Sequence, residues 1–289
     1  MLGANHQTTT TGSVFRPDIW SKEIIRATEA NLVLAEKVWR LDQDAVSKGK
    51  TVNIPQLSNL VANDKLSNTE VVLQSPTEGS VTLTINQHKH TAFLVEDILA
   101  TQSQYSLLSE YTKKAAYAIK RAVDTSIANL ATGFSTAKGA YNTTITTAAV
   151  LGSVQALDDA DAPLTDRAWV LKPKAVADLR TISDYTRYDG TGYAGAAAKG
   201  GIGDGSAVKS NGQVGMLYNA PVLMSTQIAQ SGNNISNMYF HKEAIALAMQ
   251  KTPRVQSAYV LQYLGDLTVA DVMYGLIETR DAFGVELKA

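Results

Sequence analysis

Alternating apolar and polar residues predict a β-strand in the first third of the chain. The apolar residues Val81, Leu83 and Ile85 alternate with the polar residues Thr82, Thr84 and Asn86. This alternation gives the strand one apolar face. A second apolar run, Val71, Val72 and Leu73, precedes this strand. Both lie in an extended excursion from Gly49 to Val95. Because a two-stranded ribbon is only marginally stable in water, we expect its apolar face to be covered by the rest of the chain or by a second copy.

Helical patterns flank the excursion on both sides. Residues 1–16 are predicted to form a flexible arm, and a helix is predicted from about Pro17 to Arg40, with Pro17 in its first turn. A long helix is predicted to begin near Glu96 or Gln104 and to end before Gly133. It carries an apolar stripe at helical spacing, formed by Leu108, Tyr111, Ala115, Ile119, Ala122, Ile127 and Leu130.

Short strands occupy the excursion and much of the second half. In the excursion, the strand Thr51–Ile54 is expected to end at Pro55, and the return strand is Thr82–Val95. Residues 135–146 are small and polar and indicate a linker. The helices predicted after it are Thr147–Asp159 and Pro173–Ile182. The strands predicted there are Arg167–Leu171, Val214–Tyr218, Pro221–Ser225, Met238–Phe240, Ile245–Met249, Ala258–Leu264, Val272–Thr279 and Phe283–Leu287.

Composition excludes several functional classes. The 289 residues include 27 acidic and 26 basic side chains, so the chain lacks the strong positive charge of many nucleic-acid-binding proteins. The absence of cysteine excludes disulfides and thiolate chemistry. Met1 to Ser13 is polar and is not a secretion signal, and no apolar run approaches the roughly 20 residues of a membrane helix.

The motifs that usually carry enzyme chemistry are incomplete. Gly190, Gly192 and Gly195 match G-x-G-x-x-G, but they follow the polar end of a predicted helix rather than a strand, within a glycine-rich stretch from Asp189 to Gly215. That context favours a surface loop over a dinucleotide site. We therefore predict no cofactor, and a nucleotide- or metal-dependent enzyme is the less favoured class.

Histidine and aspartate clusters also favour structural roles. His88 and His90 share one face of a strand, but zinc needs a third protein ligand that the neighbouring sequence does not supply. The group Asp158, Asp159 and Asp161 lacks the spacing and the glycine of a calcium loop, so we expect a solvated turn. Just downstream, Asp166 and Arg167 are expected to pair on the surface. No metal site is predicted.

Basic residues gather in two places. Arg16, Lys22 and Arg26 form a sparse set near the N-terminus without the interleaved aromatic residues of single-strand binders. A denser set lies on the long helix. It consists of Lys113, Lys114, Lys120 and Arg121. We expect these side chains to lie on a solvated face and to pair with Glu110 and Asp124, in preference to contacting nucleic acid.

The order of the elements, together with four stretches, resembles the major capsid proteins of tailed bacteriophages. The stretches are VTLTINQHKHTAFLVED (Val81–Asp97), AIKRAVDTSIANL within Tyr105–Leu130, YFHKEAIALAMQK (Tyr239–Lys251) and VMYGLIETRDAFGVEL (Val272–Leu287). In that family a strand ends in a Tyr-Gly pair, here Tyr274 and Gly275, and continues to an arginine and a small loop, here Arg280 and Gly284. Encapsulin shells and herpesvirus capsid floor domains share the fold.

The resemblance implies an α+β fold with an N-terminal arm, an extended β loop, a long spine helix in a peripheral domain, and an α/β axial domain. The implied divisions are 1–48 for the arm and its helix, 49–95 for the extended loop, 96–139 for the peripheral domain with the spine helix, 140–235 for the axial domain, and 236–289 for return strands of the peripheral domain. The extended loop is expected to lie across a neighbouring subunit.

The resemblance further implies a structural protein that assembles into pentamers and hexamers of an icosahedral shell enclosing phage double-stranded DNA. The alternative is an encapsulin-like shell that packages a cargo enzyme. Expected partners are further copies of the chain, a separate scaffolding protein, a portal, decoration proteins and weakly bound DNA, with no membrane. The expected location is the virion capsid, assembled in the host bacterial cytoplasm. The residues expected at the assembly interface are Val71, Val72, Leu73, Val81, Leu83 and Ile85.

Overall fold

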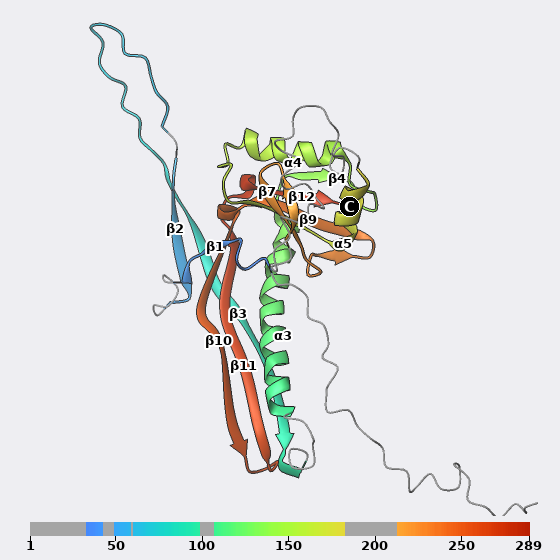
Figure 1. The fold of residues 1–289 in the computed structure, drawn as a ribbon. Helices are drawn as coiled ribbons and strands as arrows, with labels where there is room; N and C mark the ends of the chain where they lie inside the picture. Colours follow the sequence, from blue (N-terminus) through green and yellow to red (C-terminus); the bar gives the residue numbers. More distant parts are fainter. Residues whose placement is uncertain (1–32, 43–48, 59, 99–106, 183–212) are drawn as a thin grey trace, which may run out of the picture.

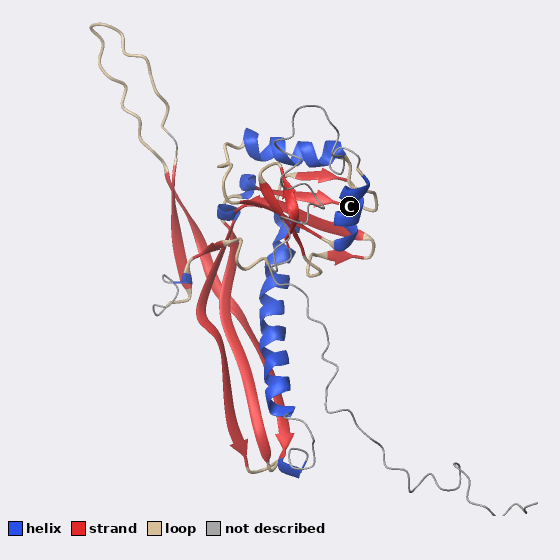
Figure 2. Ribbon diagram, viewed as in Figure 1, coloured by secondary structure: helices blue, strands red, loops and turns tan. Residues whose placement is uncertain are grey.

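The computed structural model describes residues 33–42, 49–58, 60–98, 107–182 and 213–289. A long, narrow sheet with one long helix along it is joined at one end to a compact α/β unit (Figures 1 and 2). A hairpin leaves the junction and projects away from the body (Figure 1). This is the predicted α+β fold.

The long sheet has five strands in the order β1-β10-β11-β3-β2. Helix α3 (Leu107–Asn129) packs along it and is about 35 Å long at 1.5 Å per residue. The Tyr274 and Ser126 hydroxyls, 2.8 Å apart, join sheet and helix. The strand bounds are β1 (Trp39–Arg40), β2 (Thr51–Leu57), β3 (Glu78–Glu96), β10 (Ile245–Val260) and β11 (Gly265–Glu278).

Two strand predictions for this sheet need correction. Strand β2 was expected to end at Pro55, but it continues to Leu57. Proline is tolerated because β2 is an edge strand, where a missing N–H breaks no ladder on the outer side. The separate strands predicted at 245–249 and 258–264 are mostly one strand, β10, which forms a long hairpin with β11.

The helix predicted to run to Arg40 is wrong at its described end. Residues 33–38 form turns, and β1 pairs in parallel with Ala246 and Leu247 of β10. A contact distant in sequence overrides the helical pattern, because the buried Asp124 carboxylate accepts the backbone N–H groups of Val33, Leu34 and Ala35. The remainder of that predicted helix and the arm lie outside the described residues.

The α/β unit is built on a seven-stranded sheet whose main order is β4-β12-β9-β5-β7-β6, with β8 beside β9. Helices α4 (Thr147–Asp159) and α5 (Pro173–Thr181) agree with their predictions. Short 3-10 turns are η2 (Leu130–Gly133), η3 (Lys242–Ala244) and η4 (Asp281–Phe283). The strands are β4 (Ala137–Gly139), β5 (Arg167–Leu171), β6 (Gln213–Leu217), β7 (Ala220–Met224), β8 (Gln230–Ser231), β9 (Asn234–His241) and β12 (Gly284–Lys288).

Two boundaries expected from the sequence do not coincide with a change of sheet. The stretch 135–146 is not a free linker, because β4 within it pairs in parallel with β12. The division at residue 236 falls within β9 and separates most of it, together with β12, from β5, yet β9 pairs with both β12 and β5. Strands β9 and β12 are nearly all buried, so they belong inside a covered sheet. Of the late strands, only β10 and β11 return to the long sheet.

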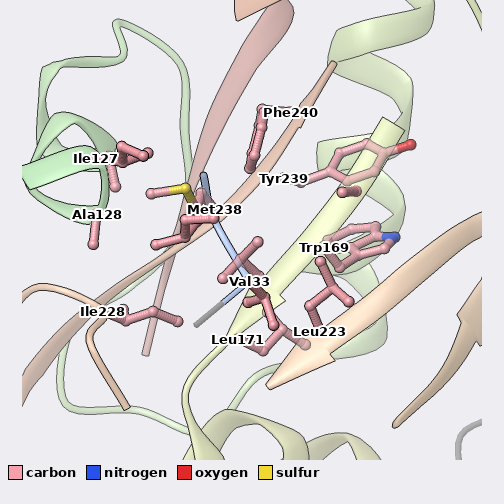
Figure 3. Packing of buried hydrophobic residues seen from close by; sticks show 14 of the residues in the cluster. Val33, Ile127, Ala128, Trp169, Leu171, Leu223, Ile228, Met238, Tyr239 and Phe240 are labelled. Carbon is pink, nitrogen blue, oxygen red and sulfur yellow. The ribbon is translucent and has the colours of Figure 1, made fainter. Parts of the chain in front are cut away.

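The core of the α/β unit is continuous with the end of α3. Trp169 and Tyr239 stack with ring centroids 3.9 Å apart, and Met238 lies near Ile127 of α3 (Figure 3). Arg167 is buried here rather than paired with Asp166 on the surface. It donates to the Asp158 carboxylate at 2.7 Å and to the carbonyls of residues 162 and 163, so this predicted surface pair is wrong.

The base of the hairpin is covered by its own chain. Leu83 is fully buried and Ile85 is 7% exposed, and both pack with Ile54, Ala246 and Ala248. Val81 lies partly buried at the edge of the same cluster. The apolar face of the 81–85 strand therefore needs no second copy of the chain, contrary to the expectation that it is an assembly surface.

Leu83→Ala is expected to destabilise the single subunit. Removing this side chain leaves a cavity in a closed cluster, and such changes lower the free energy of unfolding by about 2–5 kcal/mol. Leu73→Ala is the matched control, because Leu73 is 91% exposed and its loss should change stability by no more than about 0.5 kcal/mol. Thermal or urea unfolding of the two variants measures the difference, and equal effects would contradict the assignment.

Candidate assembly surface

The tip of the hairpin, which we define as residues 57–77, is the largest group of exposed apolar side chains on one described segment. Apart from Leu57, which ends β2 opposite Glu78, it extends beyond the paired residues of β2 and β3 and points away from both sheets (Figure 1). The side chains are between 67% and 91% exposed, and they are Leu57, Leu60, Val61, Leu66, Val71, Val72 and Leu73. A patch of this kind on a soluble protein indicates an interaction site.

Few hydrogen bonds hold the tip together. The two sides are joined by Ser58 N–H to the Thr77 carbonyl, and by the Gln74 side chain, which accepts from Val61 N–H at 2.9 Å. A turn closes the end, where Thr69 N–H donates to the Leu66 carbonyl and Asn68 has a φ of 65°. Between these points the described residues of the tip form no ladder of main-chain bonds. Its extended backbone therefore retains unused donors and acceptors.

Glycine 275 marks the place where the hairpin leaves the long sheet. The pairing of β3 with β11 shifts by one residue there, since Tyr274 faces Gln87 while Gly275 faces Ile85. A Cβ atom on Gly275 would lie 2.5 Å from the Thr84 carbonyl oxygen, so only glycine fits beside this bulge. The family signature noted in the sequence therefore has a steric reason.

A second contact fixes the base of the hairpin from the other strand. Gln56 Nε2 donates to the carbonyl of Thr279 at 3.0 Å, which ties β2 to the end of β11. Together with the cluster around Leu83, this bond orients the tip relative to the body.

The six interface residues expected from the sequence separate into two groups. Val71, Val72 and Leu73 lie together on the exposed tip, whereas Leu83 and Ile85 lie in the buried base with Val81 at its edge. Sequence reasoning missed the other exposed side chains of the tip, Leu57, Leu60, Val61 and Leu66. These residues lie in a part of the excursion without amphipathic periodicity, and that absence of a pattern was the signal that could have predicted their exposure.

One residue of the histidine pair, His88, takes part in a polar contact across three strands. His88 Nε2 lies 3.4 Å from Asp271 Oδ2, and Arg254 donates to both oxygens of the same carboxylate at 2.7 and 3.1 Å. These bonds from Arg254 hold the pKa of Asp271 below its usual value, although burial acts in the opposite direction. No group of metal-ligating side chains occurs among the described residues.

The charged residues of α3 differ partly from expectation. Glu110 pairs with Lys113 at 3.1 Å, and the Arg121 guanidinium donates to Gln227. Asp124 is not on the solvated face, because it is almost fully buried as the acceptor for residues 33–35. That burial raises the pKa of Asp124, although its three backbone donors act to lower it.

Two further expectations concern the glycine motif and the membrane. Gly190, Gly192 and Gly195 lie outside the described residues. Among the helices that are described, none is long and apolar enough to cross a membrane.

Comparisons with known proteins identify similar chains. A family model described as phage capsid protein matches residues 81–286. A solved structure from Mycobacterium phage Che8 is 24% identical with a TM-score of 0.75, covering 94% of this chain and 97% of that one. The capsid structure of the cyanophage P-SCSP1u is 15% identical with a TM-score of 0.76, covering 99% and 96%. The capsid of Ralstonia phage GP4 is 10% identical, with a TM-score of 0.71 and 94% coverage of both chains. No curated protein matches the sequence.

Gly275→Ala is expected to destabilise the subunit and to loosen the hairpin. The new methyl group meets backbone atoms, so β3 must move, which costs about 1–3 kcal/mol. Gly79→Ala is the control in the same hairpin, because its Cβ would lie 3.8 Å from Gln56 Cβ, an ordinary contact. Unfolding curves and amide exchange of residues 78–87 test this, and similar behaviour of the two variants would rule out the steric explanation.

The ion pair of Arg254 and Asp271 is expected to stabilise the fold in a pH-dependent way. The pKa of Asp271 is lowered from 3.8 on folding, so the contribution is complete above pH 3.8 and is lost as the pH falls through the folded value. Arg254→Met should therefore lower the melting temperature near pH 7 and have little effect in strong acid. Lys113→Met, which removes a more exposed partner, should have a small effect at neutral pH. A deficit of Arg254→Met that is constant across pH contradicts this reading.

Proposed function

The chain belongs to the phage capsid protein family and is a structural capsid shell protein, and from this premise we propose that its copies assemble into the pentamers and hexamers of an icosahedral shell around double-stranded DNA. The observation that carries this proposal is the exposed apolar tip on a firmly held hairpin base. An exposed apolar surface of this kind marks an interaction site, and an identical subunit supplies the partner in a shell.

The geometry supports contacts between different patches on neighbouring copies. The tip projects away from the rest of its own chain (Figure 1). Contacts of one patch with a different patch on the next copy generate rings when the rotation closes. In this arrangement, the long sheet with α3 serves as the peripheral domain and the seven-stranded unit as the axial domain.

The energetic contribution of each contact is modest. Apolar burial stabilises by roughly 25 cal/mol per Å², so 200 Å² of tip surface contributes about 5 kcal/mol before ordering costs. Because each subunit both offers and receives a tip, several such contacts act together within a ring. A shell therefore does not require strong pairwise affinity.

The remaining parts of the proposal concern partners and place. A scaffolding protein, a portal and decoration proteins are proposed to join the shell in the bacterial cytoplasm, and packaged DNA to contact it weakly. The near-neutral net charge of −1 is consistent with a wall that does not bind DNA tightly. We propose no catalytic role for the chain.

Replacing Val71, Val72 and Leu73 with serine is expected to prevent closed particles while leaving the subunit folded. These side chains contribute nothing to the protomer core, so the melting temperature should be unchanged. Leu164→Ser, on the α/β unit and 70% exposed, is the control and should assemble normally. Electron microscopy and sedimentation of the nuclease-treated particles measure assembly.

The same preparations test the enclosed material. Nuclease-protected DNA inside particles supports the phage role, whereas a protein cargo supports the encapsulin-like alternative. Normal closed particles from the triple serine variant would overturn the role of the tip.

A further inference from the structure

Three short crossings join the long sheet and its helix to the α/β unit. The first follows α3 through η2 to β4, the second runs from β9 through η3 to β10, and the third runs from β11 through η4 to β12. Ser135 N–H in the first crossing donates to Asp281 Oδ1 in the third at 2.9 Å. Phe134 packs over Gly284, where a Cβ atom would lie 2.2 Å from the ring. The crossings are therefore in mutual contact, and a change of angle between the two units has to involve them.

Thr279 connects two of these crossings to the hairpin. It directly follows β11 and is 7% exposed. Its N–H donates to the Ala244 carbonyl at 2.9 Å and its hydroxyl donates to the Glu243 carbonyl, both in η3. Its own carbonyl accepts Gln56 Nε2 at 3.0 Å. All three polar groups of this residue are therefore used, and their partners lie on η3 and on β2.

The bond from Gln56 holds a part of the hairpin that otherwise has few fixed contacts. Of the hydrogen bonds between described residues, only this one joins residues 53–82 to the body. Ile54 and Val81 also pack in the cluster around Leu83, but apolar contacts are not directional. A hydrogen bond requires alignment of donor and acceptor, so the bond from Gln56 fixes a direction that the apolar contacts leave free.

We propose that Thr279 is a positioning residue that couples the direction of the tip to the angle between the α/β unit and the long sheet, with Gln56 as the link. The inference rests on the proposed shell function, in which one sequence occupies both pentamers and hexamers. Rotation of the α/β unit displaces η3 and with it the Thr279 carbonyl, so the hairpin follows or the bond breaks. The bond, made or broken, supplies the two states that a coupling between distant parts requires.

The competing explanation is that the cluster around Leu83 alone sets the direction of the tip. The five buried members of that cluster lie on β2, β3 and β10, which are all strands of the long sheet. A hairpin held only by this cluster would follow the long sheet and would not respond to the α/β unit. The two explanations therefore differ in whether the hairpin depends on the α/β unit.

Distances between pairs of spin labels within one chain test the proposal. The chain contains no cysteine, so labels attach only at introduced ones. Ser80→Cys on the hairpin with Gln155→Cys on α4 reports the hairpin relative to the α/β unit, and Gln155→Cys with Gln256→Cys on β10 reports the angle between the units. All three positions are exposed. Diluting the labelled chains in excess unlabelled chain restricts the signal to distances within one copy.

Gln56→Met keeps the length of the side chain and removes its donor. It should broaden the distance distribution between labels at 80 and 155 and leave the distribution between 155 and 256 unchanged. Gln74→Met is the matched control, because the Gln74 amide bonds only to Val61 within the tip, and it should alter neither pair. An unchanged distribution between 80 and 155 in Gln56→Met overturns the proposal. Equal broadening of both pairs also overturns it, because the bond would then only stabilise the fold.

The hydroxyl of Thr279 provides a second test. Thr279→Val removes the bond to η3 and should broaden both distributions, because the crossing and the acceptor for Gln56 loosen together. Thr279→Ser keeps the hydroxyl and should give the distributions of the parent chain. A Thr279→Val variant in which only the pair 155 and 256 broadens would show that the hairpin does not follow this crossing.

Assembly separates this inference from the proposed function. Gln56→Met should give particles of mixed size and open forms in electron microscopy under conditions where the parent chain gives closed particles of one size. Uniform closed particles from this variant would overturn the link between the coupling and the shell. If the parent chain forms no particles, the proposed function fails, while the distances within single chains still decide whether the coupling exists.

Discussion

A single strand, β3, takes part in both the subunit core and the projecting hairpin. The rest of the structure depends on which of its residues pair with β11 and which pair with β2. Its residues from Ile85 onward pair with β11, while residues 78–84 pair with β2. The two ladders meet at the bulge opposite Gly275, where the buried Leu83 and Ile85 anchor the strand. Because the branch point is packed, the direction of the tip is set by the core of the subunit.

The same packing makes the subunit a complete folding unit. The cluster that contains Trp169 and Met238 of the α/β unit also contains Ile127 of α3 and Tyr274 of the long sheet. Residues 33–35 are fixed to this body by Asp124, whose burial is offset by three backbone donors. Assembly is therefore not needed to finish the core of the described residues, and their largest exposed apolar surface, the tip, remains available for partners.

Local pattern predicted most elements, whereas contacts distant in sequence decided the exceptions. The helices near residues 147 and 173 and the long helix follow from periodicity and agree with the structure. The helix predicted to Arg40 fails because Asp124, about 90 residues away, captures its end. The alternation around Leu83 correctly predicted an apolar face, but nothing in it could show that Ala246 and Ala248 cover that face. For the same reason the sequence pattern could not separate the exposed side chains of Val71, Val72 and Leu73 from the buried ones of Leu83 and Ile85.

The exposed surfaces show how such a chain can avoid uncontrolled aggregation. Long apolar edges pair indiscriminately, and natural proteins limit this with charge, proline and short open intervals. Here Lys251 and Pro253 lie on the outer edge of β10, which among the described residues has a partner strand only at Ala246 and Leu247. Acidic residues are interspersed with the apolar side chains of the tip. The stretches of the β10 edge and of the tip that lack charge or proline are therefore short, so each contact is weak by itself. Weak contacts become effective only when many of them act together. They therefore favour a closed shell over irregular association, since closure lets each copy use both its own tip and the surface that receives a neighbour's tip.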